Sequence, residues 1–142
     1  MASNSSPQPV LEELDRAVCM RLLGDGGIGR IAFDDGEGPT VVPVNYAVDG
    51  DAVVFRTSVS GRLNRSLLTA VVGGAVRAAF EVDRFDESTR EGWSVLVRGG
   101  AHPLTDEEKA TAAQVQPWPG GDREAWFRLS ALEVSGRRLH RP

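Results

Sequence analysis

The stretch that decides the fold is residues 40–62, which read TVVPVNYAVDGDAVVFRTSVSGR. Residues alternate between two faces over 40–48, and a short apolar segment follows over 52–57, so both segments predict β-strands. The Asp49-Gly50 dipeptide between them tolerates the positive φ angles of a tight turn. The sequence therefore predicts a hairpin and an antiparallel start to the sheet.

Polar residues interrupt this hairpin where a plain core would be apolar. Asn45 lies in the first strand, although asparagine is a poor strand former, and Arg56 ends the second strand on the face that carries Val54. Guanidinium groups hold a phosphate well when hydroxyl or backbone donors lie nearby, and Thr57 and Arg62 follow within a few residues. We therefore expect a site for a planar ligand that bears a phosphate. The alternative is that both arginines are solvated surface charges and that the Asn45 amide bonds to backbone.

Hydrophobic spacing predicts the remaining elements. We expect helices over residues 10–23, 63–71 and 105–114, the last opened by a capping-box pattern. We expect further strands over residues 28–33, 75–82, 93–101 and 126–134. Residues 83–92 are expected to form a polar loop and residues 136–142 a basic tail.

The connections between these strands favour a closed or partly closed sheet. A parallel, doubly wound fold would place a helix between nearly every pair of strands, whereas turns alone join the first three strands here. We therefore predict a mainly β fold with short helices, arranged as a six-stranded antiparallel barrel.

Three glycines, Gly24, Gly26 and Gly29, match the Gly-x-Gly-x-x-Gly pattern of dinucleotide-binding folds. That pattern works between a strand and a following helix, because the amino terminus of the helix faces the pyrophosphate. Here a predicted helix precedes the glycines and a strand follows them. We interpret Gly24 as the end of the first helix and the others as part of the turn.

Composition limits the classes of protein. The 142 residues suffice for one domain with a core, which we place at residues 10–142, and 41% hydrophobic with 25% charged residues is ordinary for a globular chain. A net charge of −4 argues against a non-specific nucleic-acid binder. No apolar run approaches the ~20 residues of a membrane span. Residues 1–9 lack a basic leader followed by an apolar run, so we expect a disordered tail and a cytoplasmic protein.

Few side chains suit metal binding or nucleophilic catalysis. The single cysteine, Cys19, excludes an internal disulfide and, with only two histidines, leaves too few soft ligands for zinc. Cys19 occupies a helical position that suits a small buried residue, and His102 has no nucleophile near it in the sequence. We assign no metal site and no catalytic residue.

Three tryptophans, Trp93, Trp118 and Trp126, could stack on an aromatic ligand. Large aromatic side chains more often belong to a core or an interface. Trp118 is the most suggestive of the three, because it lies in a loop bounded by proline and glycine, where contact with a ligand or a second subunit is easier.

Short motifs spread over the chain from Leu11 to Leu139 are together fairly specific in order and spacing. They are Cys19 with Leu22-Leu23, Gly29-Arg30, Pro43-Val44-Asn45-Tyr46, Phe55-Arg56-Thr57, Gly61-Arg62, Gly92-Trp93-Ser94-Val95, Pro117-Trp118 and Gly136-Arg137-Arg138. On these motifs the chain resembles the pyridoxamine 5′-phosphate oxidase-related, FMN-binding split-barrel family, in its short actinobacterial-type branch.

The resemblance implies a six-stranded split barrel that forms a homodimer with FMN at the subunit interface. It implies that residues 43–46 line the isoalloxazine, that residues 55–57 with Gly61 and Arg62 reach its pyrimidine edge and phosphate, and that residues of either subunit complete the site. Many relatives carry lysine where this chain has Arg62. The positive charge is the same, but the arginine side chain differs in length and in hydrogen-bond geometry. The cofactor-binding residues implied are Pro43, Val44, Asn45, Tyr46, Phe55, Arg56, Thr57, Gly61, Arg62, Trp93, Ser94 and Trp118.

The resemblance further implies an FMN-dependent oxidoreductase of unassigned substrate, in which the flavin carries the redox chemistry and no side chain is required as a base. The vitamin-oxidising reaction does not carry over, because the substrate-phosphate constellation of true pyridoxamine phosphate oxidases has no counterpart here. The alternatives are a flavin-storing or flavin-sensing module without catalysis, a deazaflavin-dependent reductase, a haem protein, and an interaction dimer with an empty pocket. A deazaflavin has a longer acidic tail, which would call for a broader basic groove to which Arg65, Arg137 and Arg138 could contribute.

Overall fold

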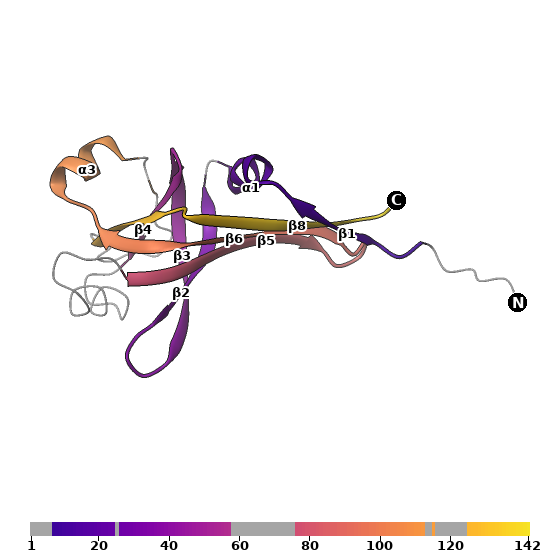
Figure 1. The fold of residues 1–142 in the computed structure, drawn as a ribbon, viewed down its shortest axis with the longest axis horizontal. Helices are drawn as coiled ribbons and strands as arrows, with labels where there is room; N and C mark the ends of the chain where they lie inside the picture. Colours follow the sequence, from indigo (N-terminus) through magenta and orange to yellow (C-terminus); the bar gives the residue numbers. More distant parts are fainter. Residues whose placement is uncertain (1–6, 25, 58–75, 113–114, 116–124) are drawn as a thin grey trace, which may run out of the picture.

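The described chain is mostly antiparallel sheet with two short helices (Figure 1). The computed structural model describes residues 7–24, 26–57, 76–112, 115 and 125–142. In these ranges the elements are β1 (Val10–Leu14), α1 (Arg16–Leu23), β2 (Gly27–Asp34), β3 (Pro39–Asp49), β4 (Ala52–Thr57), β5 (Val76–Asp86), β6 (Glu91–Pro103), α3 (Asp106–Thr111), β7 (Ala125–Ser130) and β8 (Glu133–His140). Neither helix in these ranges is long and apolar enough to cross a membrane.

Six of the strands close into a barrel, as the sequence predicts. In the order β6, β5, β2, β3, β4, β7 each strand pairs antiparallel with the next, and β7 pairs back to β6. Outside this ring β8 pairs with β6, and β1 pairs with β8. These two strands and the adjoining parts of β5 and β6 form an arm that extends from the barrel toward the chain termini (Figure 1).

Strand β6 changes partner along its length. Residues 92–98 pair with β8, and residues 101–103 pair with β7. Gly99 lies at the change, where a Cβ atom would collide with the carbonyl oxygen of Ser130. The missing side chain therefore lets the end of β7 approach β6 closely enough to close the barrel.

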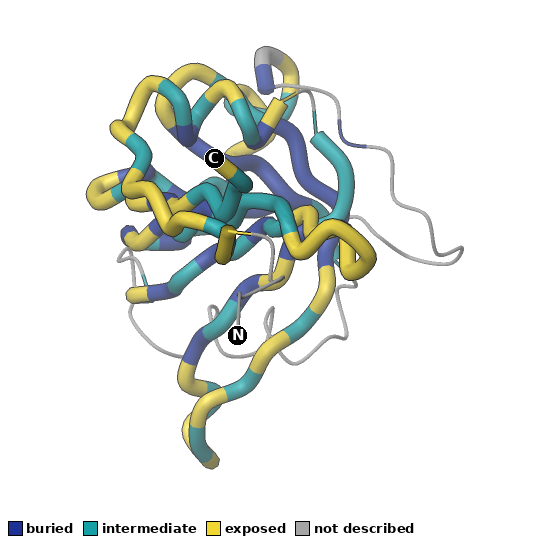
Figure 2. Tube along the Cα trace, turned by 90° about the vertical axis from the view of Figure 1, so that its right-hand side faces the viewer, coloured by how far each residue is buried: buried dark blue, intermediate teal, exposed yellow. Residues whose placement is uncertain are grey.

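The barrel interior is filled by the inward faces of the strands. Tyr46 and Phe80 meet edge to face with ring centroids 4.9 Å apart, and Phe55 lies 5.6 Å from Phe127. The largest fully buried side chains are Phe55, Phe80, Phe127, Leu23, Ile31, Leu129, Val53, Val54, Val82, Val95, Val97 and Val115. Exposed residues gather instead on the tip of the β2–β3 hairpin, which projects from the body (Figure 2).

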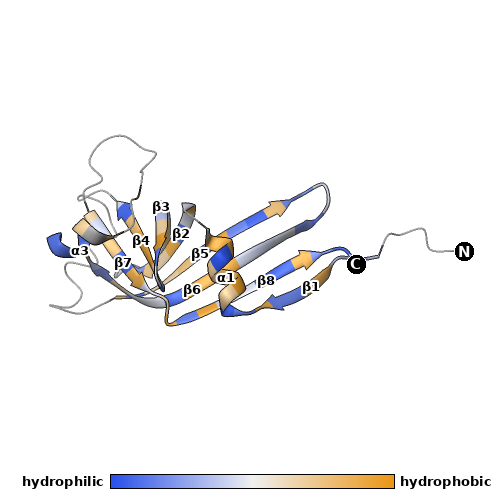
Figure 3. Ribbon diagram, turned by 90° about the horizontal axis from the view of Figure 1, so that it is seen from above, coloured by the Kyte–Doolittle hydropathy of each residue, from blue (hydrophilic) through white to orange (hydrophobic). Residues whose placement is uncertain are grey.

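Helix α1 packs against β6 and β8 (Figure 3). Its side chains Cys19 and Leu23 are buried, and the Tyr46 hydroxyl donates a hydrogen bond of 2.6 Å to the Leu23 carbonyl. Cys19 belongs to the core, and its burial raises the pKa of the thiol. The helix ends at Gly24, whose φ of 65° suits glycine, as the sequence predicts.

Two predicted boundaries are wrong at the chain ends. Val10–Leu14 is strand β1 and not the first turns of a helix, because its backbone pairs with β8. The segment predicted as one strand over residues 126–134 divides at residues 131–132 into β7 and β8. Consequently the predicted basic tail is strand β8, which lies between β6 and β1.

The remaining predictions hold more closely. Strands β2 to β6 are confirmed, although β5 and β6 extend through Asp86 and from Glu91 and so shorten the expected loop. Helix α3 opens with the predicted capping box, in which Thr105 and Glu108 exchange hydrogen bonds of 3.1 Å, but it ends at Thr111. The helix predicted over residues 63–71 lies outside the described residues.

Packing at Gly29 yields a stability prediction. A Cβ atom at Gly29 would overlap the ring of Phe80 inside the barrel, so Gly29→Ala should lower the free energy of unfolding by about 1–3 kcal/mol through overpacking. Urea denaturation would measure the change. In a Phe80→Leu background the same substitution should cost clearly less, since the overlapping ring is gone. Equal costs in both backgrounds would show that the Gly29–Phe80 contact is not the cause.

Candidate functional site

Strand alternation divides the predicted site residues between two faces of the barrel wall. Val44, Tyr46 and Phe55 point inward and belong to the buried core. Asn45 pairs in register with Arg56, so both point outward from β3 and β4. Side chains can therefore contact a ligand at this wall only from the outer face, whereas the inward residues offer it their backbone alone.

The outward row across three strands consists of Asn45 on β3, Arg56 on β4 and Trp126 on β7. The Arg56 guanidinium lies over the Trp126 ring, 4.4 Å from its centroid, and its Nη1 donates a hydrogen bond of 3.2 Å to the Val115 carbonyl. These two contacts fix the plane of the guanidinium. The row thus presents an oriented cation beside an amide.

Asn45 has only 7% of its surface exposed and is the one buried polar or charged residue in the described core. Every buried side-chain nitrogen and oxygen atom in the described part has a hydrogen-bond partner. An amide is costly to bury without such partners. Asn45 thus lies buried on the outer wall, beside Arg56 and with its polar atoms partnered.

A second apolar cluster covers the wall beside this row. Ala47 and Val54 pack there with Leu104, Ala112 and Val115, and Trp126 borders them. Helix α3 lies in the sequence between two members of this cluster, Leu104 and Ala112. Hydrogen bonding from the backbone N–H of Thr105 holds the pKa of the Glu108 carboxyl below its usual range.

An ion pair lies on the same outer face, at the end of β3 nearest the β3–β4 turn. Arg128 Nη1 lies 3.0 Å from Asp49 Oδ2. Asp49 carries the one carboxylate on this face of the described strands β3 and β4. The apolar pair Ala47 and Val54 lies between it and the row of Asn45, Arg56 and Trp126.

The structure brings together only part of the predicted site. Pro43 is exposed on the outer face, and Thr57 is half-buried at the end of β4. Trp93 packs against the core from β6, and Ser94 lies on the opposite face of that strand. In the closed strand order β6 lies across the barrel from β3, so neither residue reaches Arg56 within one chain. Gly61, Arg62 and Trp118 lie outside the described residues.

Trp126 is the residue that sequence reasoning did not assign to the site. The sequence offers it as one of three tryptophans that could stack on a ligand, and its neighbours in the sequence do not distinguish it from the other two. Its role follows from the β4–β7 register, which pairs it with Arg56 across 70 residues of sequence.

The donor set of this row suits a heterocycle that carries a phosphate. An amide can both donate to and accept from a ring edge, and a guanidinium can hold an anion. Among the described residues no group of three or more His, Cys, Asp and Glu side chains could hold a metal ion. The residues present therefore fit a flavin better than a metal centre.

The contact between Arg56 and Trp126 can be measured by a double-mutant cycle. Arg56→Gln and Trp126→Leu should show a coupling free energy of about 0.5–2 kcal/mol in chemical denaturation, because the cation lies over the ring. Arg77→Gln on β5, across the barrel, is the matched control and should show no coupling with Trp126→Leu. Additive effects for the Arg56 pair would contradict the stacked geometry.

Comparisons with known proteins identify the family and the fold. Residues 15–138 match the family model described as pyridoxamine 5′-phosphate oxidase. The uncharacterised Mycobacterium tuberculosis protein Rv0080 is 36% identical over 139 residues, which is 95% of this chain and 91% of that protein. The FAD-binding protein of Mycobacterium smegmatis aligns with a TM-score of 0.67 at 27% identity over 91% of this chain and 98% of its own. A Corynebacterium glutamicum structure shows the same fold, with a TM-score of 0.75 at 23% identity over 92% of this chain and 99% of its own. The chain therefore belongs to the pyridoxamine 5′-phosphate oxidase family and has its split-barrel fold.

Proposed function

We propose that this protein binds FMN on the outer face of β3, β4 and β7 and works as a flavin-dependent oxidoreductase. The observation that carries the proposal is the row of Asn45, Arg56 and Trp126, in which a buried amide lies beside a guanidinium held against an indole. Membership of the family supports it, as does the FAD-binding relative from Mycobacterium smegmatis.

The side chains of this row would bind and orient the cofactor. The Asn45 amide suits the polar edge of the isoalloxazine, and Arg56 suits the anionic end. The apolar cover beside the row would exclude water from one side. The flavin itself supplies the electron-transfer chemistry, so no protein group is required as a general base.

We favour FMN over a dinucleotide because the polar groups are close together in the chain. Arg56 and Thr57 are followed by the predicted phosphate residues Gly61 and Arg62, which form a compact set suited to one terminal phosphate. The Mycobacterium smegmatis relative is named for FAD, so FAD is the alternative that a direct competition should address.

The first test is the visible absorption spectrum of the purified protein, as isolated and after incubation with FMN and gel filtration. Flavin bands at about one FMN per chain are expected. A protein that retains no flavin would contradict the proposal, and a Soret band would indicate haem instead. If flavin is retained but no nicotinamide cofactor reduces it, a storage or sensing module becomes the better description.

A charge-matched pair of variants tests the site. Replacing Arg56 and Arg62 together by Ala should weaken FMN binding by at least ~2 kcal/mol if each makes a charged hydrogen bond to the phosphate. Fluorescence titration would measure this affinity, with FAD in parallel. The control replaces Arg77 and Arg98, which lie on β5 and β6 across the barrel, and should leave the affinity unchanged. Equal losses in both double variants would indicate a general charge effect and not a site.

We further propose that a second copy of the chain completes the cofactor site. The candidate row lies on the outside of a closed barrel, so one chain leaves a planar cofactor open on one side. Flavin should then raise the thermal midpoint and oppose dissociation on dilution, because a ligand stabilises the state that binds it. Analytical ultracentrifugation with and without FMN measures this linkage. A monomer that binds FMN equally well would contradict the interface placement.

A further inference from the structure

His102 lies near the end of β6, on the same outer wall as the candidate site. It pairs in register with Arg128 on β7, two residues beyond Trp126, so its side chain shares the face that carries Trp126 and Arg56. Its Nε2 atom lies 3.6 Å from Oε2 of Glu108 on α3, and 34% of the histidine side chain is exposed. This pair therefore joins the barrel wall to the helix.

The carboxylate of Glu108 also belongs to the start of α3. Its Oε1 atom accepts a hydrogen bond of 3.1 Å from the backbone N–H of Thr105, and the Glu108 N–H donates one of 3.1 Å to the Thr105 hydroxyl. The bond from Thr105 lowers the pKa of Glu108 the most, and the charge of His102 acts in the same direction. The two oxygens of one carboxylate thus connect the imidazole with the first turn of the helix.

The residues that flank α3 contact the candidate site. Leu104 precedes the helix, and its N–H donates a hydrogen bond of 2.9 Å to the Trp126 carbonyl. Ala112 follows the helix and belongs with Val115 to the apolar cluster beside the row. The Val115 carbonyl accepts the hydrogen bond of 3.2 Å from Arg56. The position of α3 on the wall therefore bears on the orientation of the Arg56 guanidinium.

We propose that His102 is a positioning residue for the cofactor site, whose charged form holds Glu108 and so keeps the Val115 carbonyl against Arg56. The imidazolium attracts the carboxylate, whereas the neutral ring lacks that attraction. A guanidinium that is already oriented loses less freedom when an anion binds it. The inference rests on the proposed function, and it adds that flavin affinity depends on the charge of a residue outside the row.

The charges around His102 give this effect its sign. Arg128 lies 3.0 Å from Asp49, and Lys109 lies 3.7 Å from Asp106, so each of these cations has its own carboxylate. Raising the pH through the range in which imidazoles titrate, about pH 5 to 8, should therefore break the pair with Glu108 and weaken flavin binding. The charged groups of the described elements packed around the imidazole are Asp106, Glu107, Glu108 and Lys109 on α3, Arg128 on β7 and Asp49 on β3.

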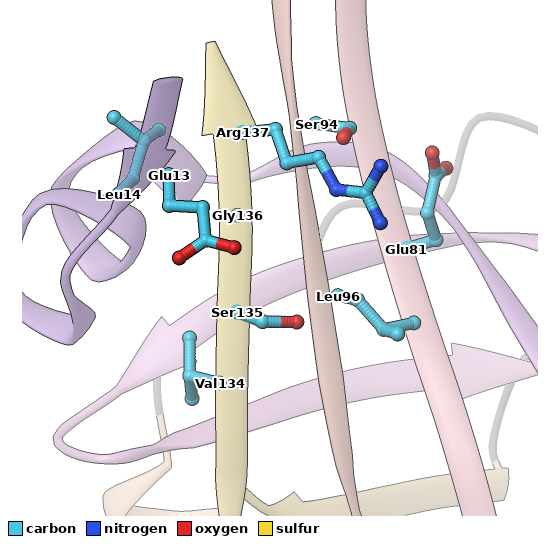
Figure 4. A pocket seen from close by; sticks show the side chains of 9 residues that line it. All are labelled: Glu13, Leu14, Glu81, Ser94, Leu96, Val134, Ser135, Gly136 and Arg137. Carbon is cyan, nitrogen blue, oxygen red and sulfur yellow. The ribbon is translucent and has the colours of Figure 1, made fainter. Parts of the chain in front are cut away.

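His140 provides a matched control elsewhere in the chain. It is the only other histidine, and its Nε2 atom lies 3.3 Å from Oε2 of Glu12 on β1. Ser94 and Arg137 line a groove on the outer face of the arm, which fits the contact between two copies proposed above (Figure 4). Three positions separate His140 from Arg137 along β8, so His140 lies on the opposite face of that strand.

The first experiment is an NMR pH titration of the ¹⁵N-labelled full chain without cofactor, over about pH 5 to 8. The backbone amide of Val115 and the indole N–H of Trp126 should shift in one common transition, because both residues contact Arg56. The transition should be absent from His102→Gln and from Glu108→Gln, whose new glutamine keeps the capping box without a charge. It should persist in His140→Gln. Its persistence in His102→Gln, or its absence from the parent chain, would overturn the proposal.

The second experiment measures FMN affinity by fluorescence titration at both ends of this pH range. The phosphate of FMN itself changes charge near about pH 6, so the quantity compared is the Kd of His102→Gln divided by the Kd of the parent chain. This ratio should be about two- to fivefold at the low end, as expected of a partly exposed ion pair, and about one at the high end. His102→Arg keeps a positive charge and should retain the tighter binding at the high end.

The two experiments separate this inference from the proposed function. A ratio of Kd values that does not change with pH, while FMN binds, would overturn the role of His102 at the cofactor site. A chain that binds no FMN at either pH would overturn the proposed function instead, and the positioning of Arg56 would then stand or fall with the cofactor-free titration.

Discussion

Everything else in the molecule depends on the pairing of β6 with three other strands. Along one edge β6 holds β5, and along the other it holds β8 first and β7 afterwards. The bare backbone at Gly99 permits this change of partner by admitting the Ser130 carbonyl. A side chain there would collide with this carbonyl and hinder closure of the six strands around the inward faces that carry Phe55 and Phe80.

Closure of the barrel also determines which residues of a strand face the core and which face outward. Because each strand alternates between core and exterior, stability and ligand contact use different residues of one strand. Phe55 stabilises the barrel, and its neighbour Arg56 faces outward against Trp126. A substitution at one of two adjacent positions should therefore impair folding, whereas the other should impair binding.

How much of this was predictable depends on the range of the interactions. The β3–β4 hairpin is readable from the sequence because its alternation and the Asp49-Gly50 signal are local. Its register is not, because Asp49 pairs with Ala52, and only that register places Asn45 opposite Arg56. Strand β8 is not readable in this way, since its glycine and consecutive arginines resemble a solvated tail. Its strand conformation comes from backbone pairing with β6 and with β1, where Glu13 lies opposite Arg137. Trp126 joins the site for the same long-range reason.

Strand β1 lies at one end of the strand order, which makes it an edge strand through which the sheet could pair with another chain. An edge strand offers unpaired N–H and C=O groups to any other chain, and stacking of such edges is a route to aggregates. Here Pro7 and Pro9 immediately precede the strand and cannot donate backbone hydrogen bonds, and Glu12 and Glu13 place consecutive like charges within it. The terminal strand can thus complete the arm while discouraging edge-to-edge growth of the sheet.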